Sequence, residues 1–282
     1  LYAKNLYIFG GFNGSSWMGM SLSKLATMRV PEKDRIELIR RGKLSELSLI
    51  PPFKALWQYG EYGDIPEFKA TGVQVLDTVF YPDIGNNWNN AAYLAISKQY
   101  LKDALYVLRT MPGVYVKGVA ESFKLFFFPS SDWFHQYASV KNVEKIGYFE
   151  RVYNRCIEGQ FFGSIAPGID HVIDPGYFGS ARNIGFFILV IYIVSCGYGL
   201  RLLFLVMSGK RKVSAGFIAV AAMMVTIVYA TCAGNLLEVG ENYRFRFDID
   251  PLLIVLFGMF LNDCAGRYIS ARRHDGNAGR ER

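Results

Sequence analysis

The chain has 282 residues, of which 51% are hydrophobic and 16% aromatic, and its formal net charge is +7 at pH 7. All four tryptophans and most charges lie in residues 1–182, whereas residues 183–262 are mostly apolar with few charges. The basic residues gather beside apolar segments, and neither an RNA-binding motif nor a zinc-ligand spacing occurs. These features exclude nucleic acid as the expected partner and favour a membrane.

The first residues, LYAKNLYIFGGF, look like the exit from an earlier membrane helix. They do not resemble a signal peptide, because they lack a basic segment followed by an apolar run. We therefore expect a further N-terminal part before Leu1. The glycine-rich Gly10–Ser16 lacks the Lys-Ser/Thr of a phosphate loop, and Asn13-Gly14-Ser15 is a formal glycosylation acceptor.

Residues 1–182 are predicted to form short helices and loops, with Pro31–Pro66 rich in loops. A helix is predicted over Tyr93–Thr110, because Leu94, Leu101, Leu105 and Leu108 fall on one stripe and Pro112 follows.

The segment Val114–Phe128 is predicted to be an amphipathic helix. One face carries Tyr115, Val119, Phe123 and Phe126, and the other carries Lys117, Glu121 and Lys124. Two interpretations stay open: the helix lies along the bilayer surface, or it packs on the core of its own region.

Few residues suggest metal or covalent chemistry. Asp170, His171 and Asp174 are metal-ligand types in a short stretch, but side chains that cap a turn are the commoner explanation. The three histidines are scattered, so no Ser-His-Asp site is predicted. We assign no cofactor, leave a divalent metal open, and expect the four cysteines to be free thiols.

Three apolar segments near the C-terminus are long enough to be membrane spans. Ile184–Met207 and Ala215–Ala233 can each cross a hydrocarbon core of about 30 Å. The third, Pro251–Leu261, is short alone. Extended to Ile269 it can span, provided that Asn262 and Asp263 face protein or the interface.

The basic residues between and after these segments predict their orientation. Ser208–Ser214 holds Lys210, Arg211 and Lys212, a pattern typical of a cytoplasmic loop. The predicted fold is therefore an all-α integral membrane protein with two to three transmembrane helices. We expect an extracytoplasmic region (1–182), a transmembrane region (183–269) and a cytoplasmic basic tail (270–282), with Gly234–Asp250 on the outer side.

The segment GENYRFRFDIDPLL, Gly240–Leu253, is the strongest candidate for a binding site. Arg244 and Arg246 stand on the side where positive charge is disfavoured. In an extended backbone they would share a face suited to a phosphate or pyrophosphate. The alternative is internal neutralisation by three nearby carboxylates: Glu241, Asp248 and Asp250.

The stretch from Glu241 to Pro251 resembles the C-terminal part of polytopic glycosyltransferases with the GT-C fold, the relatives of protein mannosyltransferases and aminoarabinose transferases. In these the segment often reads E-x-R-Y-R-x-P-x-x-P; here Asp248 replaces the first proline and the Arg-Tyr order is altered. Lys4–Leu22 also looks like a segment of bacterial members. The resemblance covers about a third of the chain.

The resemblance implies transfer of a sugar from a polyprenyl-phosphate carrier to an acceptor outside the bacterial inner membrane. It implies that Arg244 and Arg246 either contact the lipid phosphate or have a structural role, and that Glu241 and Asn242 orient them. The catalytic base is expected in an N-terminal loop that precedes this chain, so no catalytic residue is assigned. The alternative is a non-catalytic membrane protein with an outer domain, for envelope assembly or interaction. A transporter fits less well, because Ala215–Ala233 has almost no intramembrane polar residue.

Overall fold

A computed structural model gives the arrangement of residues 6, 17–60, 70–82, 85–127, 186–240 and 242–278. The side chains of Phe186, Tyr243, Arg244 and residues 271–278 are not described. Several sequence-based predictions lie outside the described residues: the glycine-rich segment with its glycosylation acceptor, the Asp170–Asp174 stretch, Cys156 and Glu241.

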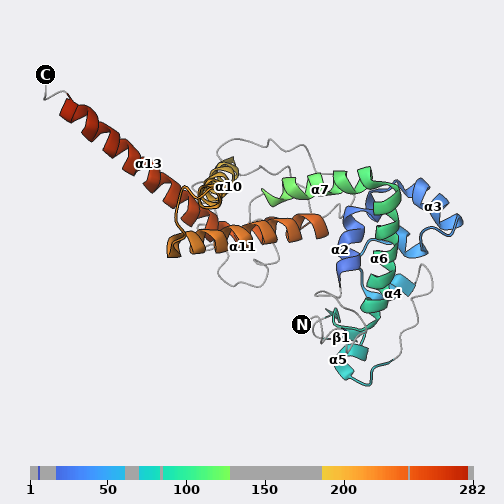
Figure 1. The fold of residues 1–282 in the computed structure, drawn as a ribbon. Helices are drawn as coiled ribbons and strands as arrows, with labels where there is room; N and C mark the ends of the chain where they lie inside the picture. Colours follow the sequence, from blue (N-terminus) through green and yellow to red (C-terminus); the bar gives the residue numbers. More distant parts are fainter. Residues whose placement is uncertain are drawn as a thin grey trace. The chain divides into compact units, whose positions relative to one another are not determined.

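The fold is mostly helical and divides into two compact units (Figure 1). The first unit holds the described residues of Leu1–Phe123 together with Asn235–Gly240. The second unit holds those of Lys124–Pro167, Ala181–Gly234 and Glu241–Arg282. The prediction of a helical protein with long apolar helices near the C-terminus and shorter ones before them is confirmed.

The first unit consists of short elements. They are α2 (Met18–Leu25), η1 (Thr27–Arg29), α3 (Glu32–Arg40), η2 (Glu46–Leu49), α4 (Leu56–Gly60), α5 (Gln74–Asp77), β1 (Phe80–Tyr81), β2 (Gly85–Asn86), α6 (Ala92–Thr110) and α7 (Pro112–Phe126), whose last three residues belong to the second unit. The two strands pair antiparallel, with Phe80 opposite Asn86. The loop-rich prediction for Pro31–Pro66 is wrong at α3, which begins directly after Pro31. Its first turn holds Glu32 and Asp34, and acidic side chains interact favourably with the dipole at a helix N-terminus.

The core of the first unit forms around α6. The predicted helix is confirmed, but the leucine stripe is not its buried face: Leu105 is 38% exposed, whereas Tyr93, Ile96 and Tyr100 are buried. The tyrosines pack there because their hydroxyls find partners: Tyr100 donates to the Ile50 carbonyl at 2.8 Å and Tyr93 to the Lys54 carbonyl at 2.9 Å. A buried Tyr with its hydroxyl bonded contributes area without a desolvation penalty.

Two glycines allow helices of the first unit to approach closely. A Cβ atom at Gly19 of α2 would meet the Ser97 carbonyl oxygen of α6, and one at Gly118 of α7 would meet the Leu25 carbonyl oxygen of α2. Both obstructing atoms belong to the backbone, which cannot move aside as a flexible side chain can. Small residues at these two positions therefore set the spacing of α2, α6 and α7.

The second unit contains α10 (Phe186–Met207), α11 (Ala215–Leu237), α12 (Asn242–Phe247) and α13 (Asp250–Ala278). Three of its stretches are long and apolar enough to cross a membrane: Phe187–Met207, Ala215–Leu237 and Asp250–Ser270. The chain therefore has the helices of an integral membrane protein. The second helix continues to Leu237, beyond the predicted Ala233.

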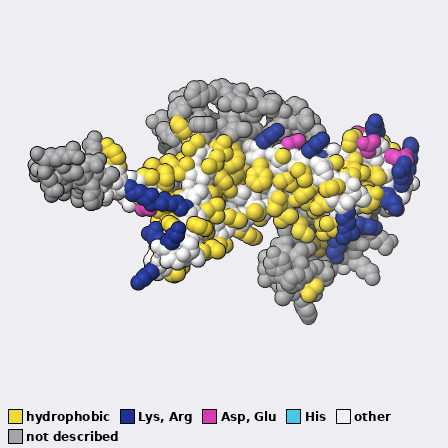
Figure 2. All heavy atoms as spheres, turned by 45° about the horizontal axis from the view of Figure 1, so that its top comes forward, with side chains coloured by type: hydrophobic (Ala, Val, Ile, Leu, Met, Phe, Trp, Pro, Cys, Tyr) yellow, Lys and Arg dark blue, Asp and Glu magenta, His cyan; other side chains and the backbone are white. Residues whose placement is uncertain are grey.

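Hydrophobic side chains cover much of the surface of the second unit (Figure 2). Phe204 on α10, Val225 on α11 and Val255 on α13 are 64%, 69% and 51% exposed. Helices that are apolar on all sides suit a lipid environment rather than a single buried face. The third span was expected to require that Asn262 and Asp263 face protein or the interface. Asp263 does face protein, because it accepts a hydrogen bond from the Tyr198 hydroxyl of α10 at 2.9 Å.

Candidate functional site

The segment with the two candidate arginines forms the short helix α12, Asn242–Phe247. The extended backbone that would place Arg244 and Arg246 on one face is therefore not present. Two helical residues at i and i+2 are separated by about 200° around the axis. The helix thus places the two arginines at nearly opposite positions.

Arg246 lies inside the second unit with no exposed surface. Its Nε donates to the Asp250 carboxylate at 3.2 Å, and its Nη1 donates to the Phe126 carbonyl at 3.0 Å. Asp250 is the first residue of α13, where a carboxylate also interacts favourably with the helix dipole. For this arginine the geometry favours internal neutralisation, with Asp250 as one of the three carboxylates considered.

Asn242 is also buried, and it connects α12 to α11. Its side-chain amide donates to the Gly234 carbonyl at 2.7 Å. A Cβ atom at Gly234 would lie 3.0 Å from the Phe245 ring, so the glycine leaves room for α12 beside α11. Asn242 thus has a clear part in placing the segment, whether or not it also orients an arginine toward a ligand. The side chain of Arg244 and all of Glu241 lie outside the described residues.

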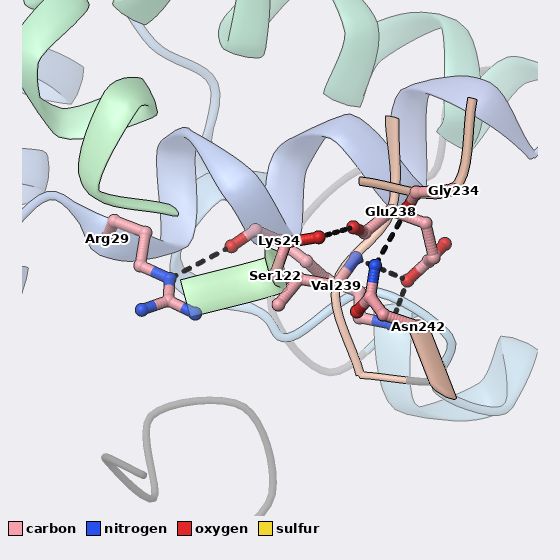
Figure 3. Close-up of polar contacts among 7 residues, drawn as sticks. All are labelled: Lys24, Arg29, Ser122, Gly234, Glu238, Val239 and Asn242. Carbon is pink, nitrogen blue, oxygen red and sulfur yellow. Dashed lines mark hydrogen bonds and ion pairs between the residues drawn. The ribbon is translucent and has the colours of Figure 1, made fainter. Parts of the chain in front are cut away.

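A second polar cluster lies in the first unit, where Asn235–Gly240 meets α2 and α7 (Figure 3). Lys24 forms an ion pair with Glu238, and the Ser122 hydroxyl lies 3.0 Å from both the Asn235 side-chain oxygen and the Glu238 carbonyl. The Lys24 ammonium also lies 5.1 Å from the centre of the Phe53 ring, within cation–π range.

The sequence gives no signal for this cluster, because Lys24 and Glu238 are far apart along the chain and neither stands in a recognisable motif. Its partly buried ion pairs include a further one between Arg29 and Glu121. Arg29 also donates from Nε to the Lys24 carbonyl at 3.3 Å, so the two pairs adjoin (Figure 3). These contacts join separate segments of the first unit, so the cluster has a structural role.

Helix α7 buries the predicted aromatic face only in part: Phe126 is fully buried and Phe123 is 37% exposed. Gly118 and Ser122 are also buried, while Val116 is 62% exposed. Glu121 is paired with Arg29, so it does not belong to a free polar stripe. These contacts favour the interpretation that one face of α7 packs on its own region. That the other face of α7 lies along a bilayer stays a prediction.

The described residues contain no group of three His, Cys, Asp or Glu side chains that could hold a metal ion. Cys196, Cys232 and Cys264 are free thiols, as predicted. Comparisons with family models, curated proteins and solved structures found no match to this chain.

Proposed function

We propose that this chain is the C-terminal membrane part of a GT-C-type glycosyltransferase that takes a sugar from a polyprenyl-phosphate carrier and transfers it to an extracytoplasmic acceptor. Three helices able to span a membrane support a lipid-linked donor. The resemblance of Glu241–Pro251 to the corresponding family segment supports the reaction class. Within this chain, Arg244 is the residue proposed to contact the carrier phosphate.

The observation that carries the assignment is the helical register of α12. Arg246 makes its contacts inside the second unit with Asp250 and the Phe126 carbonyl. Arg244 occupies the position about 200° away around the helix. The two arginines therefore take different roles in the proposal: Arg246 holds α12 on α13, and Arg244 binds the phosphate.

The chemistry requires a cation at this point because transfer leaves negative charge on the carrier phosphate. A guanidinium stabilises such charge through charge-assisted, bidentate hydrogen bonds. The proton of the acceptor must go to a carboxylate, and no residue of this chain is assigned to that role. Asn242 contributes by fixing α12 to α11 through the Gly234 carbonyl.

The test compares Arg244→Ala with Arg246→Ala in the complete protein. Binding of undecaprenyl phosphate is measured by titration in detergent, with each variant normalised to monodisperse protein. Arg244→Ala should weaken binding about ten- to a hundred-fold while leaving the unfolding midpoint unchanged. Arg244→Lys should recover only part of the affinity, since it keeps the charge and loses the planar fork. Unchanged affinity in Arg244→Ala would refute the phosphate role.

A non-catalytic membrane protein is the second candidate, and the first unit favours it. The ion pairs Lys24–Glu238 and Arg29–Glu121 and the buried Ser122–Asn235 contact all tie segments together. A region whose segments are held together in this way suits a docking or assembly role. If undecaprenyl phosphate fails to bind the unaltered protein at all, this second candidate becomes the better account.

A further inference from the structure

A small cavity opens among α10, α11 and α13 within the second unit. Its volume is about 140 Å³. Arg211, Asn262 and Asp263 supply polar groups to its wall, and Leu202 and Met259 supply apolar ones. Pockets that enclose whole drug-sized molecules start at roughly 300 Å³. This cavity is therefore of a size for one headgroup, with the rest of a ligand left outside it.

Basic residues are frequent in the segments that supply the cavity wall, and one of them, Arg211, lines it. Arg201 on α10, Arg267 on α13, and Lys210 and Lys212 in the loop between α10 and α11 are exposed and lie close in sequence to residues of its wall. The carboxylate of Asp263 already accepts the Tyr198 hydroxyl. Together with Arg211, these residues give five cations against the one carboxylate of Asp263, so the charge of these segments is net positive and suits an anionic group.

We propose that this cavity binds the headgroup of an anionic phospholipid, with Arg211 contacting the phosphate. The apolar wall and the exposed apolar surfaces of α10 and α13 provide a path for the acyl chains. Basic pockets between transmembrane helices near a membrane surface are suited to such headgroups. Asn262 and Asp263 provide hydrogen-bond partners for hydroxyls on the headgroup, such as those of a glycerol.

This site is separate from the α12 segment and does not depend on the proposed enzyme activity. Helix α11 connects the two, with Gly216 in the wall of the cavity and Gly234 beside α12. At 1.5 Å per residue they are separated by about 27 Å along the helix. That separation is close to the thickness of a hydrocarbon core, about 30 Å, so the two places belong to opposite membrane surfaces.

The test uses the purified complete protein in a neutral detergent, titrated with three probes: short-chain phosphatidylglycerol, short-chain phosphatidylcholine and inorganic phosphate. Arg211→Ala is compared with Lys210→Ala, which removes the same charge from the same loop but does not line the cavity. The expected result is selective phosphatidylglycerol binding that Arg211→Ala weakens about tenfold or more and that Lys210→Ala changes by less than about threefold.

Each other result counts against the site. Equal weakening by both variants would mean attraction by the basic loop as a whole. Equal affinity for phosphatidylcholine would remove the role of net charge, and equal affinity for inorganic phosphate would remove the role of the lipid. Unfolding midpoints of the two variants should match that of the unaltered protein, which separates lost binding from lost folding.

Discussion

The two units solve the problem of packing helices in different ways. In the first unit, helices such as α2 and α6 bury one face, and tyrosine hydroxyls, ion pairs and glycines at backbone crossings hold the helices together. The second uses long helices that are apolar on every side, with large hydrophobic residues exposed on α10, α11 and α13. A helix needs a polar outer face opposite its apolar buried face only where the surroundings are polar, so the contrast indicates that the two units are built for different solvents.

The largest effect of a substitution is expected at the buried ion pair of Arg246 and Asp250 in the second unit. Arg246→Ala would leave the Asp250 carboxylate buried without this partner. The free energy of unfolding should fall by about 3–5 kcal/mol, the cost of an uncompensated buried charge. The measurement is unfolding of the complete protein by denaturing detergent in mixed micelles.

A double variant separates the lost ion pair from lost volume. Arg246→Met with Asp250→Asn removes both charges and keeps similar bulk, so it should recover most of the stability. If Arg246→Ala costs less than about 1 kcal/mol, Arg246 does not hold α12 in place, and its assignment to a structural role is wrong.

The glycine crossings of the first unit predict a smaller effect. A methyl group at Gly118 would meet the backbone of Leu25, so Gly118→Ala should destabilise by about 1–3 kcal/mol through overpacking. The matched control is Gly113→Ala in the same helix, where a Cβ atom meets nothing. That change should be neutral or slightly stabilising because Ala favours a helix. Equal unfolding midpoints for the two variants would contradict the proposed close crossing of α2 and α7.

A carboxylate in the first unit gives a pH-dependent prediction. Burial raises the pKa of the Asp103 carboxyl, although hydrogen bonds from Ser45 and Gln99 act in the opposite direction. The folded state therefore holds this proton more tightly than the unfolded state. The contribution of Asp103 to stability is complete below the unfolded pKa of about 3.9 and is lost as the pH rises through the raised value.

The measurement compares unfolding midpoints of the unaltered protein and Asp103→Asn across this pH range. The unaltered protein should lose stability relative to the variant as the pH rises, because Asn cannot ionise. Parallel curves for the two proteins would show that the folded environment does not perturb the carboxyl.

The sequence predicts the second unit better than the first for a physical reason. A membrane span needs only sufficient length and apolarity, and both can be read locally, so the three spans follow from composition. The buried face of α6 was missed because Tyr93 and Tyr100 are amphipathic, and their burial depends on the carbonyls of Lys54 and Ile50 far along the chain. The leucines of α6 form the more regular stripe in the sequence, but Leu105 is 38% exposed.

The candidate site was only partly predictable. The sequence located Arg246 and named Asp250 among its possible partners, and the structure pairs these two residues. The prediction of a shared arginine face failed because it required an extended backbone, whereas residues 242–247 form a helix. The cavity near Arg211 was not foreseen, since its wall comes from three helices that are separated in sequence.

Helix α11 is expected to cross the membrane, and two cysteine probes, one on either side of it, give the most direct test. The four native cysteines are first replaced. Lys210→Cys and Asp248→Cys then place single thiols at exposed positions before and after the helix. In intact cells an impermeant maleimide should label position 248 and leave position 210 unlabelled until the membrane is permeabilised. Labelling of both positions in intact cells, or of position 210 alone, would contradict this account.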